Sequence, residues 1–563
     1  MDFTEALVTW PRMHHLFAVL CLVTVVYKVS LLFAKRKAGF SNTESFPGPP
    51  GHWLFGHVLQ FKQDGTDFNQ LMEWAKQYPY AFPLWFGPFT CFVNIHHPDY
   101  VKTILTSTEP KDDMAYRFIK TWIGDGLLVS SGQKWFRHRR LLTPGFHYDV
   151  LKPYVKLMSD SAKTMLDKWE SYGDTNKSFE LFEHVSLMTL DSILKCAFSH
   201  SSNCQTEGGT NAYIKAVYEL SYLVNLRFRT FPYHNDLIFY LSPHGFRFRK
   251  ACRVAHSHTE DVIRKRKEEL KEEKELDRIQ AKRNLDFLDI LLCARDESQQ
   301  GLSDEDLRAE VDTFMFEGHD TTSSGLAFIL YCLSCHPEHQ QKCRDEITEV
   351  LQDKDTIEWD DLNKIPYTTM CIKESLRLHP PVPGMARQLT KPMTFCDGRT
   401  LPAGCLVGTS VYGIHMNATV WENPYVFDPL RFLPENVSKR SPHAFVPFSA
   451  GSRNCIGQNF AMNEMKVVTA LTLRRYQLTE DPTCKPKIIP RLVLRSLNGI
   501  HIKIKPVCER LTWIISINSR LSLFEANTRT ERQFPLRCKL LKIRLVKILS
   551  LNKFSSGVSE HMQ

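Results

Sequence analysis

Apolar residues recur at helical spacing over most of the chain. The stretches 151–169, 213–224 and 252–278 have the amphipathic or highly charged pattern of helices. Nothing in their length or spacing resembles an internal repeat. These segments predict a body built mainly from helices.

One predicted helix is unusual because polar residues interrupt it. Ser303 and the acids that follow have the character of a capping box, and helical sequence continues until Pro337. Its middle, residues 314–322, contains a glycine, two acids and two threonines among apolar residues. Glycine and threonine are poor helix formers, and a buried acid is costly. Such violations inside a strong element often mark a functional site.

The extended segments are short and lie late in the chain. Residues 399–404 read as a turn between two short extended segments. Residues 492–505 alternate around Asn498-Gly499, a pattern that predicts a β-hairpin. We therefore expect a large, mainly α domain with small β-sheets.

The N-terminal region contains one long apolar stretch. Residues 16–34 carry a single charge, and a bilayer span needs roughly 20 apolar residues. A cleaved signal peptide is the alternative, but no small-residue cleavage site precedes the basic residues 35–37. We expect an uncleaved transmembrane anchor in the endoplasmic reticulum membrane. Because the positive charges follow the span, residues 1–15 are expected in the lumen and the body on the cytosolic face.

The composition divides the rest of the chain into three parts. Residues 35–51 read as a basic and proline-rich linker, and the body follows as a domain over 52–507. Residues 508–563 form a basic C-terminal extension of unknown role. Its ten lysines and arginines and its four glutamates account for +6 of the net charge of +9. The body is therefore nearly neutral, which argues against nucleic-acid binding.

The cysteines are too sparse to form a structural framework. Sixteen cysteines in 563 residues do not make a disulfide scaffold, and thiols stay reduced in the cytosol. Cys332 and Cys335 have the spacing of half a zinc site, but no second pair completes it. We expect both to be core residues.

One cysteine lies in an informative setting. Cys455 follows Arg453 in a glycine-flanked loop, and a helix is predicted to begin near Gln458. Backbone N–H groups at a helix N-terminus stabilise a thiolate, and the arginine adds positive charge. A buried structural cysteine in a turn, the alternative, would not require this combination.

This loop resembles the haem-thiolate signature of the cytochrome P-450 superfamily, F-x-x-G-x-R-x-C-x-G, at every fixed position from Phe448 to Gly457. The resemblance implies that Cys455 is the axial ligand of the iron in haem b, where a thiolate favours O–O cleavage. It also implies the P-450 fold, preceded here by one N-terminal transmembrane helix.

Other motifs of the superfamily occur in the expected order. Glu374 and Arg377 match its E-x-x-R helix, which locks to an arginine of a later segment, here Arg431, and holds the cysteine loop in place. Three further residues match elements that contact the haem propionates together with Arg453, and arginine suits carboxylate geometry. These residues are Trp135 and Arg139, which form a W-x-x-x-R element, and Arg387.

Within the superfamily the chain resembles the fourth family, and most closely its B-type branch, which oxidises fatty acids and small xenobiotics. Residues 122–128, 138–147 and 310–322 carry this resemblance. The implied protein is a membrane-anchored monooxygenase that inserts one oxygen atom of O₂ into C–H bonds. The implied substrates are fatty acids, oxidised at or near the terminal carbon, and small xenobiotics.

The interrupted helix supplies the remaining site residues by this resemblance. Asp320 and Thr321 correspond to an acid–alcohol pair that delivers protons, and Gly318 is expected to let the backbone approach the haem. Glu317 lies on the same helical face, and many members of the fourth family esterify this glutamate to a haem methyl. A protonated or hydrogen-bonded glutamate is the alternative.

The electrons must come from a partner, because the chain has no convincing dinucleotide or flavin motif. We expect an NADPH-dependent haemoprotein reductase, with a cytochrome b-type protein as a second donor. Lys134, Arg137 and Lys466 are candidates for its docking surface. Two other functions stay open: a haem-thiolate isomerase or dehydratase that uses no external electrons, and a non-catalytic haem-binding sensor. Thr321 argues against the first, because such enzymes often lose this residue.

Overall fold

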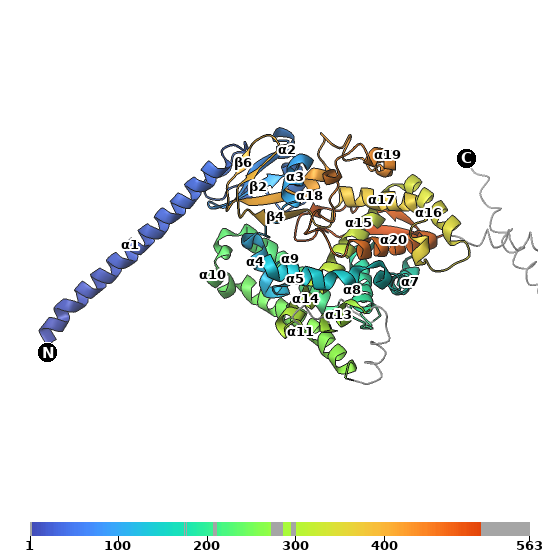
Figure 1. The fold of residues 1–563 in the computed structure, drawn as a ribbon, viewed down its shortest axis with the longest axis horizontal. Helices are drawn as coiled ribbons and strands as arrows, with labels where there is room; N and C mark the ends of the chain where they lie inside the picture. The colour runs from blue at the N-terminus through green and yellow to red at the C-terminus, as the bar shows by residue number, and fades with distance from the viewer. Residues whose placement is uncertain are drawn as a thin grey trace, which may run out of the picture. The chain divides into compact units, whose positions relative to one another are not determined.

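Helices dominate the body, and its strands are short (Figure 1). The computed structural model describes residues 3–173, 175, 177–206, 211–271, 285–293 and 300–507. The predicted C-terminal extension, 508–563, lies outside the described residues. The predicted fold class is confirmed.

The N-terminal helix is longer than the predicted anchor. Helix α1 spans Phe3–Thr43, and His15–Ala34 form its one stretch that is long and apolar enough to cross a bilayer. Phe46, which was predicted to lie in the linker, is buried in the body with its ring 6.0 Å from that of Phe395. Helix α1 is therefore a candidate membrane anchor, and the predicted linker 35–51 is largely helix or body.

The helices of the body fall into two groups along the chain: those before the interrupted helix, and those from the interrupted helix onward. The first group comprises α2 Asp67–Gln77, α3 Pro98–Leu105, α4 Asp113–Ile123, α5 Gly132–Leu142, α6 Tyr148–Leu151, α7 Tyr154–Gly173, α8 Leu181–Ala197, α9 Ala212–Arg229, α10 Asp236–Leu241, α11 Pro243–Glu269 and α13 Phe287–Cys293. The second comprises α14 Asp304–Phe316, α15 Thr322–Cys335, α16 Pro337–Leu351, α17 Pro366–Leu378, α18 Val411–His415, α19 Pro434–Val437 and α20 Gln458–Arg475. Short 3₁₀ helices link them: η1 Val58–Gln60, η2 Thr143–Phe146, η3 Phe231–His234, η5 Trp359–Asp361, η6 Pro429–Phe432 and η7 Pro442–Ala444.

The three amphipathic segments form helices as predicted, within α7, α9 and α11. Helix α11 begins at Pro243 rather than at 252, because Ser242 caps it by accepting a hydrogen bond from the Gly245 N–H. Helix α11 ends at Glu269, with Leu270 as its cap, so it is shorter than the predicted stretch, whose residues from 272 to 278 lie outside the described residues.

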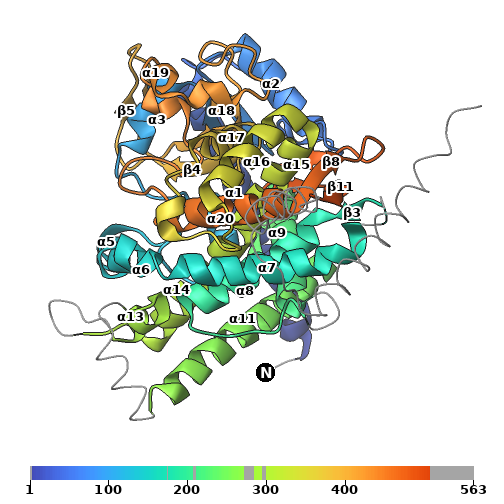
Figure 2. The same ribbon diagram turned by 90° about the vertical axis from the view of Figure 1, so that its right-hand side faces the viewer.

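The interrupted helix is confirmed, and its middle is a π-helical turn. The Ser303 hydroxyl accepts a hydrogen bond from the Asp306 N–H at 3.1 Å and caps α14. The π-helix η4, Glu317–Thr321, separates α14 from α15. A π-helical turn often occurs at a functional site. Helix α15 packs against α8, α17 and α20, so this element runs through the helical core (Figure 1, Figure 2).

Within the described residues, the strands form four small sheets. The largest has the order β1-β2-β7-β4, in which only β2 and β7 are parallel. A second has the antiparallel order β3-β11-β8, and β5-β6 and β9-β10 are two-stranded. The bounds are β1 Ala81–Phe86, β2 Thr90–Ile95, β3 Phe179–Glu180, β4 Gly384–Gln388, β5 Met393–Thr394, β6 Thr400–Leu401, β7 Leu406–Ser410, β8 Tyr476–Glu480, β9 Ile488–Ile489, β10 Arg495–Ser496 and β11 His501–Pro506.

The predicted hairpin around Asn498-Gly499 is wrong. The chain turns there, with Gly499 at a φ of +76°, but its two flanks, β10 and β11, do not pair with each other. Strand β10 pairs with β9, and the Asn498 side chain accepts a hydrogen bond from the Lys487 N–H at 2.7 Å. Strand β11 pairs with β8 and β3, where Ile502 and Ile504 are buried. The predicted turn at 399–404 likewise contains a strand, β6.

We predict that a chain ending at Val507 folds as well as the full chain. Strand β11 ends at Pro506 and has both of its partner strands within the body. The midpoint of thermal unfolding and the bound haem per chain should therefore match those of the full-length protein. A chain ending at Ile500 is the control: it lacks β11 and should lose both. Loss of either property in the Val507 chain would contradict the predicted boundary.

Candidate active site

The loop before α20 holds Cys455 at the N-terminus of that helix. The Cys455 N–H donates to the Phe448 carbonyl oxygen at 2.9 Å, which closes the loop on itself. Gly451 has a φ of +73°, and a Cβ atom there would lie 2.0 Å from the Leu105 carbonyl oxygen. Only glycine fits this position. Helix α20 begins at Gln458, as predicted.

The Cys455 thiol has an environment that disfavours its charged form in the absence of a metal. Burial raises the pKa of Cys455 to about 12 and the carboxyl of Glu317 adds to the increase, whereas the Gly457 N–H and Arg139 act in the opposite direction. The side chain is still reachable from a cavity of about 580 Å³, lined also by Arg139, Phe146 and Ile456. A coordinated metal ion deprotonates a thiol outright, so this cysteine suits a metal ligand better than a free nucleophile.

Helix α5 is tied to the cysteine loop by two arginines. The guanidinium of Arg139 donates to the carbonyl and side-chain oxygens of Asn454 at 2.8 and 2.9 Å. The guanidinium of Arg453 lies 4.4 Å from the centre of the buried Trp135 ring. The structure thus brings Trp135, Arg139 and Arg453 together with Cys455, although Arg139 contacts the loop itself.

Three cations are crowded next to this loop. Arg387 is buried on β4, and Arg453 donates to the Ser130 carbonyl oxygen at 2.9 Å while its Nη1 has no hydrogen-bond partner among the described residues. Burial, and then Arg387, lower the pKa of Arg453 to about 10. Burial, Arg387 and Arg453 together hold the pKa of Lys111 well below its usual range. Sequence motifs gave no sign of Lys111, which lies beside the cap of α4.

The π-helix η4 brings Glu317 close to this cationic group. Burial raises the pKa of Glu317 to about 7, against the opposing effect of Lys111, so the carboxyl is partly protonated near neutral pH. Gly318 also lies close to α8. A Cβ atom there would lie 2.8 Å from the Ile193 Cδ1 atom, so the glycine lets η4 approach α8, and its expected approach to the haem stays a prediction.

Asp320 and Thr321 have separate partners. The Thr321 hydroxyl donates to the Glu317 carbonyl oxygen at 2.7 Å. The Asp320 carboxylate is buried in an ion pair with Arg495 of β10. Arg495 was not predicted as a site residue, because nothing in its local sequence links it to a residue so far away in the chain.

Glu374, Arg377 and Arg431 meet in the core beneath the cysteine loop. Arg377 forms two hydrogen bonds of 2.7 Å to the Glu374 carboxylate, and Arg431 lies 3.4 Å from it. Arg377 also donates to the carbonyl oxygens of His415 at 2.9 Å and Pro424 at 2.6 Å. The structure therefore assembles the predicted triad and ties it to the segment that precedes the loop.

Comparisons with known proteins decide the family. The family model described as Cytochrome P450 matches residues 46–503. Cytochrome P450 4B1 of Rattus norvegicus is 54% identical over 493 residues, which cover 88% of this chain and 96% of that protein. Cytochrome P450 4B1 of Homo sapiens is 54% identical over 488 residues, 87% and 95%. Cytochrome P450 4A11 of Homo sapiens is 52% identical over 490 residues, 87% and 93%.

The chain belongs to the cytochrome P-450 family. The predicted superfamily, fourth family and likeness to its B-type branch are confirmed. The protein is a monooxygenase that uses haem b, O₂ and NADPH-derived electrons. The crowded cations Arg387, Arg453 and Lys111 fit the haem of this P-450, because its two propionates would neutralise them.

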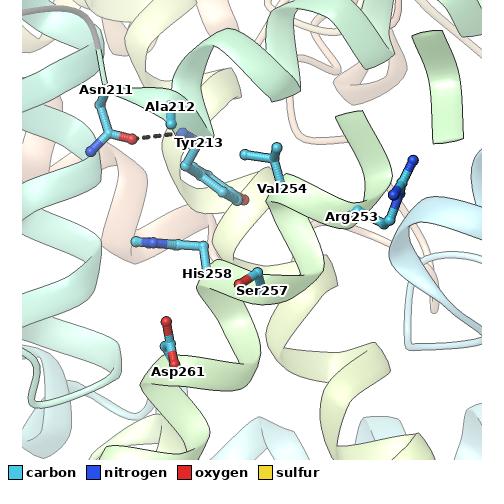
Figure 3. A pocket seen from close by; sticks show the side chains of 8 residues that line it. All are labelled: Asn211, Ala212, Tyr213, Arg253, Val254, Ser257, His258 and Asp261. Carbon is cyan, nitrogen blue, oxygen red and sulfur yellow. Dashed lines mark hydrogen bonds between the residues drawn. The ribbon is translucent and has the colours of Figure 1, made fainter. Parts of the chain in front are cut away.

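A second cavity of about 580 Å³ lies between α9 and α11 of this P-450, and none of the predicted site residues lines it (Figure 3). Tyr213 and His258 line it with their rings 4.8 Å apart. The Asn211 side chain caps α9 at its rim by accepting from the Tyr213 N–H. The Tyr213 ring also lies next to that of the buried His319 of η4, with the ring centres 6.1 Å apart.

We predict that Arg377→Ala destabilises this P-450 by about 3–5 kcal/mol, because it leaves the buried Glu374 carboxylate without its cation. The pair Lys76–Glu73 is the control: it has the same spacing and the same 2.7 Å distance but is about 60% exposed. Lys76→Ala should leave the free energy of unfolding, measured by chemical denaturation, unchanged. Equal effects of the two substitutions would show that burial does not set the strength of the Glu374 pair.

Proposed function

We propose that this P-450 hydroxylates fatty acids at or near the terminal carbon, and oxidises small xenobiotics, with haem held through Cys455. The single observation that supports this proposal most is the cysteine loop at the N-terminus of α20, beside three crowded cations. When bound, the haem supplies the binding and reductive activation of O₂. The relatives of types 4B and 4A support the choice of substrate class.

The residues around Cys455 have binding roles in this proposal. The thiolate of Cys455 ligates the iron. The side chains of Arg387, Arg453 and Lys111 donate hydrogen bonds to the propionates. Trp135 holds Arg453 through its ring, and Arg139 holds the loop through Asn454. Phe448 closes the loop through its carbonyl oxygen. The bonds of Arg139 and of the Phe448 carbonyl oxygen hold the loop within the chain, which lowers the entropic cost of binding the haem.

Glu317 has a second role in this proposal, as the residue esterified to a haem methyl. A carboxyl with a pKa raised to about 7 by burial is poorly solvated as an anion, and an ester removes the charge. The alternative is a glutamate that stays a protonated acid.

Protons reach the reacting oxygen through Asp320 and Thr321 in this proposal. Thr321 keeps its hydroxyl within the helix through the 2.7 Å bond to the Glu317 carbonyl oxygen. Asp320 is buried in its ion pair with Arg495, which holds the carboxylate in one place next to Thr321 in the sequence.

An NADPH-dependent haemoprotein reductase, with a cytochrome b-type protein as a second donor, completes the reaction. The three bases expected to face such a partner are engaged within the chain. Lys134 pairs with Asp125 at 3.2 Å and Asp306 at 2.7 Å, and Arg137 donates to the Gly301 carbonyl oxygen at 3.2 Å. Lys466 donates to the Leu362 carbonyl oxygen at 2.9 Å. These bonds weaken the case for this particular docking surface.

We place the protein in the endoplasmic reticulum membrane, with α1 as its single anchor and the body on the cytosolic face. Two segments of the body support a lipid contact because they expose large apolar side chains. Trp53 and Leu59 are 66% and 63% exposed, and Leu237 and Leu241 of α10 are 69% and 68% exposed.

Oxidation of a medium-chain fatty acid under ¹⁸O₂ tests the substrate class and the reaction together. Incubation of laurate with the protein, reductase and NADPH should give a hydroxylaurate that carries one labelled oxygen. An isomerase, a dehydratase or a haem-binding sensor would give no labelled product. Labelled products from xenobiotics alone would reject the fatty-acid assignment.

We predict that part of the haem stays on the protein after turnover and acid–organic extraction. Glu317→Ala and the near-isosteric Glu317→Gln should both release all of it, because neither variant can form an ester. The fraction of haem retained is measured by absorbance of the protein after extraction. Complete extraction from the wild-type protein after turnover would reject the ester and favour the protonated glutamate.

A further inference from the structure

The ion pair between Asp320 and Arg495 joins the π-helix to strand β10 deep inside the body. The Arg495 Nη2 and Asp320 Oδ1 atoms are in contact, and the two side chains are only 4% and 1% exposed. A buried carboxylate without a cation is costly, so the arginine is what permits a charge at this position.

Arg495 is held in place independently of Asp320. Its neighbour Leu494 accepts a hydrogen bond from the Ser324 hydroxyl of α15 at 2.8 Å, and the Leu494 N–H donates to the Pro381 carbonyl oxygen at 2.8 Å. The guanidinium lies 4.1 Å from the centre of the Phe182 ring of α8. Contacts other than the ion pair therefore hold Arg495 in the position where the Asp320 carboxylate meets it.

The pair leaves hydrogen-bonding capacity free around the acid. Among the described residues, Asp320 Oδ2 and the Arg495 Nε and Nη1 atoms have no hydrogen-bond partner. His319, the preceding residue, bonds the Ser186 hydroxyl through Nε2 at 2.8 Å, and its Nδ1 atom is likewise without a partner. Tyr213 of α9 interacts electrostatically with Asp320 and with Asp312 of α14, and His258 of α11 interacts with His319. Asp320 thus has one oxygen on the cation and one available to exchange a proton.

We propose that Arg495 is a positioning residue for proton delivery, which holds Asp320 as a charged acceptor beside Thr321. This inference rests on the proposed proton role of Asp320 and Thr321. With haem bound, Asp320 would take up one proton and pass it on through the Thr321 hydroxyl for the reduction of O₂, while the electrons would come from the reductase. The carboxylate would then return to its ion pair with Arg495.

Two substitutions at Arg495 separate charge from packing. Arg495→Gln removes the cation and favours a neutral carboxylic acid at Asp320, which should slow proton transfer. We expect less product per NADPH, more hydrogen peroxide, a larger solvent deuterium isotope effect, and a turnover lower by about tenfold. This loss is smaller than the ~10²–10⁴-fold contribution of a positioned proton donor, because Arg495 acts through Asp320. Arg495→Lys keeps the charge and should restore most of the coupling.

Arg491→Gln is the matched control. Arg491 lies shortly before Arg495 in the chain. Its guanidinium lies over the rings of Tyr218 and Tyr222 rather than against a carboxylate. The product yield, peroxide yield and isotope effect of this variant should equal those of the wild type. Haem content and the carbon monoxide spectrum are measured for every variant, so that misfolding is recognised.

The Asp320→Asn background decides whether Arg495 acts through Asp320. Adding Arg495→Gln to Asp320→Asn should cause no further loss of coupling. Equal losses in Arg495→Lys and Arg495→Gln, or additive losses in the double variant, would overturn the inference. If Asp320→Asn and Thr321→Ala leave coupling unchanged, the proposed proton role itself fails. If these two variants uncouple but Arg495→Gln does not, only the role of Arg495 fails. If Arg495→Gln does not bind haem, the coupling of Arg495→Lys is compared with that of Asp320→Asn instead. Arg495→Lys should keep most of the coupling that Asp320→Asn loses, and an equal loss in both would overturn the inference.

Discussion

The ion pair between Glu374 and Arg377 fixes a long part of the described body that has little regular structure. Between α18 and α20 the chain forms only the short helices η6, α19 and η7, so few backbone hydrogen bonds of regular structure can hold it. Arg377 instead bonds several carbonyl oxygens of this segment, among them that of His415. The His415 ring accepts from the Val446 N–H at 3.0 Å, and the cysteine loop begins just after Val446. A buried charge pair thereby positions Cys455. Removing either side chain of the pair would leave the charge of the other uncompensated.

Burial determines the chemistry of the site in the same way. Desolvation raises the pKa values of Glu317 and Cys455 and lowers those of Arg453 and Lys111, so every charge near the loop is held at a cost. A haem bound as proposed would relieve these costs together, since its iron would convert the thiol into a thiolate and its propionates would neutralise the cations. The proposal therefore couples folding to cofactor binding, as is usual where a site is assembled from poorly solvated groups.

The features that the sequence predicts well are local ones. The Cys455 loop, the capped and interrupted helix and the apolar N-terminal stretch are each defined by residues that lie within a few turns of one another. Glu374 and Arg377 are also neighbours on one helix. Non-local features that no family motif contains were missed. Strands β10 and β11 flank a good turn, but each pairs with a strand from elsewhere, and Arg495 and Lys111 reach the site only through tertiary packing. Gly318 was recognised, but its close contact with Ile193 of α8 depends on a neighbour that the pattern does not contain.

The absorption spectrum of the reduced protein with carbon monoxide tests the central claim, that Cys455 binds the haem iron as a thiolate. We expect the band typical of thiolate-ligated haem in the wild-type protein and in Cys484→Ser, a control at another cysteine of the body that is not fully buried. Cys455→Ser should lose this band. A Cys455→Ser protein that keeps the thiolate band would contradict the assignment of the ligand, and with it the placement of every residue around it.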